Sequence, residues 1–94
     1  MVASNRASRP LKGEDLETTH WEDAHHWMSI YADLIRFHIG LLARIQRELP
    51  KLQPVARDAA AVDVVIIGDL IAGYQARLDL WHALQPPAGP FVIG

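Results

Sequence analysis

The sequence ELPKLQP at residues 48–54 decides the fold, because it separates two long stretches whose apolar residues recur with helical spacing. Pro50 ends the first stretch, since a residue that precedes a proline is disfavoured in the α-helical region. Pro54 suits the first turn of a second helix, where a backbone amide has no intrahelical partner in any case. Two long helices joined by so short a turn must run antiparallel, as a helical hairpin.

The stretch before this turn predicts a helix over about residues 19–49. Its apolar residues recur at alternating steps of four and three, the heptad spacing of helices that pack along a seam. The seam residues are Ala24, Met28, Tyr31, Ile35, His38, Leu42, Ile45 and Leu49. A second row widens the apolar face and consists of Trp27, Ile30, Leu34, Phe37 and Leu41. Thr19 and Glu22 have the spacing of a capping box at the start of this helix.

The stretch after the turn predicts a second helix over about residues 54–85, with less polar surface than the first. Its seam consists of Ala60, Val64, Ile67, Ile71, Tyr74, Leu78 and Trp81. The opposite side carries small apolar residues where charges are expected, namely Ala61, Val65, Ala72 and Ala76. A helix that is apolar on nearly all sides is buried on most of them.

A lone hairpin would leave much of this apolar surface in water, more than a monomeric protein usually exposes. The sequence therefore predicts an all-α fold in which the antiparallel two-helix hairpin dimerises into a four-helix bundle, or joins a larger protein in a hetero-complex. The residues expected at this interface are Trp27, Leu34, Leu41, Val65, Ile66, Leu70 and Trp81.

Composition divides the chain into three parts. Residues 1–17 are polar and lack periodicity, which predicts an N-terminal tail. Residues 18–85 form the hairpin, with its turn at residues 50–54. Residues 86–94 begin with two prolines and predict a Pro-rich C-terminal tail.

Three polar residues fall on the apolar faces of the two helices. His38 and Asp63 lie close to the same level of the hairpin, so they are expected to form a buried polar pair, because either charge alone would be costly to bury. Arg77 also points inward and is expected to pair with the acidic residues Glu22 and Asp23 at the start of the first helix.

Histidines and carboxylates near the helix ends suggest a metal site. Glu22 and His25 are three residues apart, as are Asp79 and His82, so each pair shares one helix face. The Glu-x-x-His spacing on bundle helices is the way in which di-iron carboxylate proteins hold their metals, and these ligands would suit iron, manganese or zinc. Against this reading, Glu22 and His25 lie on the polar side of their helix rather than in the core.

Charge and residue content argue against several other functions. The 94 residues include nine Lys and Arg and eleven Asp and Glu, for a formal net charge of −2, which is unlike a strongly basic nucleic-acid binder. There is no cysteine, and no phosphate-binding glycine loop occurs. The most apolar stretch, residues 59–74, is too short and too charged to cross a membrane, and no secretory signal is recognisable, so a cytoplasmic location is expected.

The sequence thus favours a non-enzymatic helical module for protein–protein interaction or assembly, acting as a homodimer or as a small accessory subunit of a larger complex. The alternative is a metal-binding helical bundle that uses Glu22, His25, Asp79 and His82. An enzyme is not favoured, and a cofactor is expected only in the metal-binding alternative, as a transition-metal ion.

Overall fold

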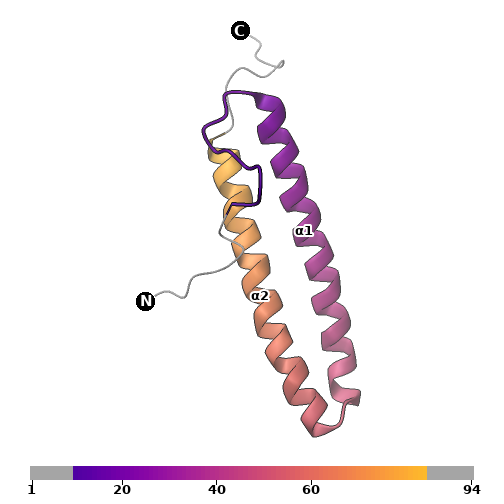
Figure 1. Cartoon of the computed structure of the whole chain (residues 1–94). Helices are drawn as coiled ribbons and strands as arrows, with labels where there is room; N and C mark the ends of the chain where they lie inside the picture. The colour runs from indigo at the N-terminus through magenta and orange to yellow at the C-terminus, as the bar shows by residue number, and fades with distance from the viewer. Residues whose placement is uncertain (1–9, 85–94) are drawn as a thin grey trace.

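The computed structural model describes residues 10–84, which form two long antiparallel helices joined by a tight turn (Figure 1). Helix α1 spans Trp21–Glu48, the short 3-10 helix η2 spans Leu49–Lys51, and helix α2 spans Pro54–Ala83. Within these residues there is no strand, and α1 and α2 contact each other along their length. The prediction of an all-α fold built on two contacting helices is therefore confirmed. The first nine residues and the Pro-rich segment 86–94 lie outside the described residues.

The two prolines shape the turn. Pro50 lies inside η2, where its missing amide proton costs nothing, and the Leu52 amide donates to the Leu49 carbonyl at 3.2 Å. Gln53 is extended, and Pro54 opens α2. The Arg57 guanidinium donates to the Leu52 carbonyl at 3.0 Å, so a polar backbone group of the turn has a partner. Each feature is local, and together they reverse the chain within a few residues.

Helix α1 begins differently from the sequence prediction. The residue before its first turn is His20, whose side chain makes no capping hydrogen bond. Instead, the Thr18 hydroxyl donates to the Asp23 carboxylate at 2.6 Å and accepts from the His20 amide at 3.2 Å. The predicted capping box of Thr19 and Glu22 is thus wrong, because the threonine and the acid that pair are each one residue away from those positions.

The fully buried side chains gather towards the open end of the hairpin, where α1 begins and α2 ends. Ala24, Tyr31 and Trp81 form this core and are completely buried. The residues packed around it are Leu11, Leu16, Trp27, Met28, Leu34, Tyr74 and Leu78. Between residues 32 and 66 no residue is fully buried. The turn half of the hairpin therefore has no enclosed core of its own.

Residues 10–20, here called the N-terminal segment, fold back against the hairpin at its open end (Figure 1). Leu11 and Leu16 pack against the core, and the Glu14 amide donates to the Leu11 carbonyl at 3.0 Å. Gly13 allows this tight turn because its φ of +89° lies in the left-handed region that other residues disfavour. Over residues 10–17 the chain is thus not the polar tail that its composition predicted, since its two leucines and Glu14 are drawn into the core.

Candidate functional site

A buried carboxylate joins the N-terminal segment to both helices. The Glu14 side chain is 0% exposed, and the Arg77 side chain is 8% exposed. Arg77 donates to Glu14 Oε2 at 2.8 Å, and the Tyr31 hydroxyl donates to Oε1 at 2.7 Å. The Trp81 indole N–H and the Leu11 amide also donate to this carboxylate. We call Glu14, Tyr31, Arg77 and Trp81 the Glu14 cluster.

The Glu14 cluster bears on the prediction that Arg77 points inward and forms an ion pair. Arg77 does point inward and does form an ion pair, but its partner is Glu14 rather than Glu22 or Asp23. Glu22 is exposed, and Asp23 binds Thr18. Sequence reasoning missed Glu14 because it lies in a segment without periodicity. The available signal was Leu11 and Leu16 on either side of it, together with an inward arginine that needed a carboxylate.

The electrostatics of the Glu14 cluster hold each group in its ordinary charge state. Burial alone would raise the pKa of Glu14, but hydrogen bonds from Tyr31, Trp81 and Arg77 outweigh burial and lower it. Burial, reinforced by the bond to Glu14, raises the pKa of Tyr31 to about 12. Burial would lower the pKa of Arg77, but the bond to Glu14 raises it above its usual range. A carboxylate, a neutral phenol and a guanidinium therefore persist through neutral pH.

These shifts predict a loss of stability in alkali. The fold favours the neutral phenol of Tyr31, so its stabilising contribution is complete below the ordinary pKa of 10 and is lost as pH rises towards 12. A shift of this size corresponds to a decrease on the order of 2–3 kcal/mol in the free energy of unfolding. Urea unfolding followed by circular dichroism at pH 8, 10, 11 and 12 would measure it.

The control for this prediction is Tyr31→Phe, which keeps the ring and removes the titrating hydroxyl. This variant should be less stable than the wild type at pH 8 but should lose less stability between pH 10 and 12. An alkaline loss as steep as that of the wild type would contradict the assignment to Tyr31. In acid the pH dependence is reversed. Because the pKa of Glu14 is lowered, its carboxylate stabilises the fold at neutral pH, and this contribution is lost as pH falls below about 4.5.

One side of α2 is covered at the open end and uncovered near the turn. Gly73 and Arg77 are buried on this side of α2, and Arg77 binds Glu14 of the N-terminal segment. Since 18 residues make five complete helical turns, Val55 lies on the same side as Gly73, and Val62 and Ile66 deviate from it by only about 20°. Yet Val55, Val62 and Ile66 are exposed, Ile66 to 51%. The apolar side thus continues beyond the segment that covers it.

Helix α1 contributes a matching row. Trp27 lies next to Gly13 of the N-terminal segment, which places the row of Trp27, Leu34 and Leu41 on the same side of the hairpin. Along this row Phe37 is 65% exposed and Leu41 is half-buried. We therefore define the bare face as the uncovered apolar surface of the turn half, formed by Phe37, Leu41, Val55, Val62 and Ile66.

The residues of the predicted interface lie in several different environments. Trp27, Leu34, Leu41 and Leu70 are half-buried, and Ile66 is exposed on the bare face. Trp81 is completely buried within the Glu14 cluster, so its place in the predicted interface is wrong. Val65 is 63% exposed but lies about 100° around α2 from Ile66, on the side of Ala61, Ala72 and Ala76. Val65 and Ile66 thus cannot both lie at the centre of one contact.

The expected buried pair of His38 and Asp63 does not form. His38 Nδ1 is 2.7 Å from the Leu34 carbonyl of its own helix, and its ring lies 5.3 Å from that of Tyr74. Asp63 is exposed. The histidine finds its polar partner one turn back along α1, and the carboxylate stays in water, so neither group needs the other.

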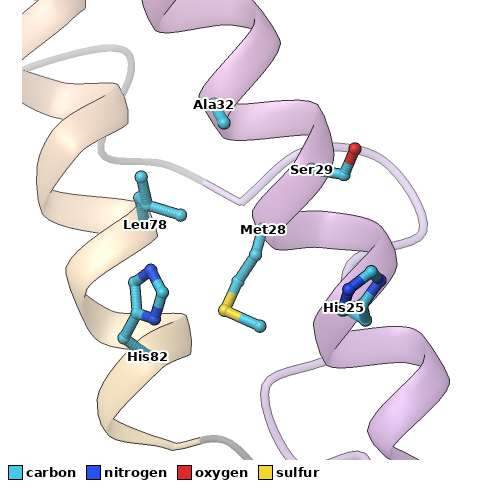
Figure 2. Close-up of a pocket in the computed structure, with 6 residues that line it drawn as sticks. All are labelled: His25, Met28, Ser29, Ala32, Leu78 and His82. Carbon is cyan, nitrogen blue, oxygen red and sulfur yellow. The ribbon is translucent and has the colours of Figure 1, made fainter.

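Two of the four predicted metal ligands line the same pocket, which has a volume of about 510 Å³. Figure 2 shows Met28 between the helices, with His82 and Leu78 on α2 and His25 and Ser29 on α1. The other two, Glu22 and Asp79, are not among the residues that line it, and Asp79 accepts a hydrogen bond from Gln75 at 2.9 Å. Among residues 10–84, no three histidine or acidic side chains are grouped closely enough to share a metal ion. The metal site stays a prediction.

Comparisons with protein-family models, with curated proteins and with solved structures found nothing that matches this chain. Over residues 10–84, neither helix combines the length and the apolar character needed to cross a membrane.

Proposed function

We propose that this protein is a non-enzymatic helical assembly module that binds a protein partner through its bare face. The observation that carries the proposal is the contrast between the two halves of one apolar side. The N-terminal segment covers the open half, while Phe37, Val62 and Ile66 stay exposed in the turn half. Exposed large apolar residues that cluster on one face mark an interaction site more often than a solvated surface.

The geometry of the bare face suits a helical partner. Its residues come from two antiparallel helices and recur at steps of four and seven, so they form ridges between which the side chains of a facing helix can insert. A partner that presents an apolar helical row would complete a bundle in the turn half. This would supply the enclosed core that the hairpin lacks between residues 32 and 66.

The Glu14 cluster supports a structural rather than a catalytic reading of the buried charges. Its carboxylate and guanidinium bind each other, and its hydroxyl and indole donate to the same carboxylate. Groups bound to one another in this way hold the N-terminal segment in place, and they lie buried rather than in contact with solvent. On this proposal they fix the boundary of the bare face.

Site-specific photocrosslinking in the organism that produces the protein tests the proposal. A benzophenone amino acid at position 37 should give one discrete protein adduct, because Phe37 lies on the bare face. Position 43 is the matched control, since Ala43 is exposed on another side of α1 and should give none. The adduct from position 37 should disappear when Ile66→Glu is added to the same chain. Equal labelling from both positions, or none from position 37, would overturn the proposal.

A further inference from the structure

The charges of the hairpin separate along its length. At the turn end, residues 44–58 carry four basic and two acidic residues. Lys51 and Glu48 are within salt-bridge distance at 3.7 Å. The remaining charges are Arg44, Arg47 and Arg57 against Asp58, an excess of two positive charges. At the open end, residues 10–25 and 77–84 carry six acidic and two basic residues. Here Glu14 and Arg77 neutralise each other in the core.

The open-end charges that face solvent are therefore mostly acidic. They include Asp15 and Glu17, which are exposed on the N-terminal segment itself. On α1, Arg44 follows Leu41 by one turn and continues the row that forms the bare face. A basic residue thus borders the bare face near the turn, while the N-terminal segment at the open end carries two exposed acidic residues and the exposed Lys12.

Because the N-terminal segment covers only part of the apolar side, this side has a raised part and a lower part. The segment lies over the side in the open half and leaves the turn half lower and uncovered (Figure 1). A second copy packed in parallel would bring two such segments, and two acidic ends, to the same place. An antiparallel copy would instead place each turn against the other copy's N-terminal segment, with opposite charges adjacent and the two bare faces in contact.

We infer that the partner of the bare face is a second copy of this chain, packed antiparallel about a two-fold axis. This inference rests on the proposed function, because it identifies the occupant of the bare face. Residues 34–49 of α1 span about 24 Å, so each copy offers roughly four helical turns to the contact. The basic turn of one copy ends next to Asp15 and Glu17 of the other. Charge then selects the orientation, and the apolar rows supply the affinity.

Disulfide trapping tests the orientation without background, because the chain contains no cysteine. Two full-length variants, Lys51→Cys and Glu17→Cys, are purified separately, mixed under reducing conditions and then oxidised. The antiparallel arrangement predicts the mixed 51–17 disulfide as the main covalent product. Predominance of the 51–51 and 17–17 products would show a parallel dimer and overturn the inference.

Charge reversal tests the basis of the orientation. The variants Asp15→Lys/Glu17→Lys and Arg44→Glu/Arg47→Glu should each weaken dimerisation by about tenfold or more in sedimentation equilibrium. One chain carrying all four changes should recover affinity to within about threefold, since the opposite charges again face each other. Circular dichroism would verify that every variant keeps the wild-type helicity. If the chain with all four substitutions did not recover its dimer affinity, the pairing of the turn with the N-terminal segment would be contradicted.

The two proposals fail in different ways. If purified wild-type protein stays monomeric up to 100 μM while position 37 still crosslinks to another protein, the inference of a second copy is overturned and the assembly module stands. If position 37 crosslinks to nothing in cells and the purified protein is monomeric, both proposals fall.

Discussion

Glu14→Gln is expected to destabilise the fold more than any other single substitution of a polar residue between positions 10 and 84. The change removes the negative charge beside Arg77, whose side chain is 8% exposed. Removing one partner of a buried ion pair costs about 3–5 kcal/mol, because the other charge remains buried without compensation. Small domains have only about 5–15 kcal/mol of stability, so a large part of the margin would be lost. Urea unfolding at pH 7, followed by far-ultraviolet circular dichroism at one fixed protein concentration, measures the effect.

Two further variants separate this effect from the general effect of removing one acidic side chain. Glu17→Gln makes the same chemical change at an exposed carboxylate and should leave the unfolding midpoint nearly unchanged. The double variant Glu14→Gln/Arg77→Met removes both charges and should regain much of the lost stability, because no charge is then left buried alone. An unfolding curve of Glu14→Gln that overlays the wild type would mean that the Glu14 cluster does not hold the N-terminal segment.

Ile66→Glu is expected to abolish assembly while leaving the hairpin folded. Ile66 is 51% exposed in the single chain, so a glutamate there keeps contact with water and costs the monomer little. In a complex the same carboxylate would lie within an apolar contact, and its desolvation should weaken association by about a hundredfold or more. Sedimentation velocity over a range of concentrations measures the association, and helicity measures the fold.

Val65→Glu is the matched control, because Val65 is the neighbouring residue and is 63% exposed. It points about 100° away from Ile66 around α2 and therefore lies off the bare face. Its assembly should match that of the wild type. If Val65→Glu dissociated the complex and Ile66→Glu did not, the contact would lie on the alanine-rich side of α2 instead.

The features of the fold that are encoded locally could be predicted from the sequence. The prolines at 50 and 54 and the three-and-four spacing of apolar residues are sufficient for two contacting helices, because helix periodicity and proline geometry act within a few residues. The inward direction of Arg77 followed from the same periodicity. So did the apolar row of α1 that contains Phe37 and Leu41.

The contacts of residues 10–17 could not be predicted in the same way. Glu14 and Arg77 are 63 positions apart, and no periodic pattern in a short irregular segment indicates what it will cover. The misplacement of Trp81 follows from this, since a large aromatic residue on an apparently open helix end resembles an interface residue until another segment buries it. The predicted pair of His38 and Asp63 does not form for another reason. His38 has a partner on its own helix and Asp63 is in water, so a similar level on two helices does not bring them together.

The distance along the chain between Glu14 and Arg77 also orders events during synthesis. A ribosome adds about 5–20 residues per second, so the 63 residues from Glu14 to Arg77 take about 3–13 s. Helix α1 can form within about a microsecond. Its apolar rows then stay exposed until the last turns of α2 have been synthesised. Through that interval the nascent chain exposes the kind of apolar surface on which chaperones act. A product truncated before Arg77 would keep that surface exposed, because Glu14 would lack its partner.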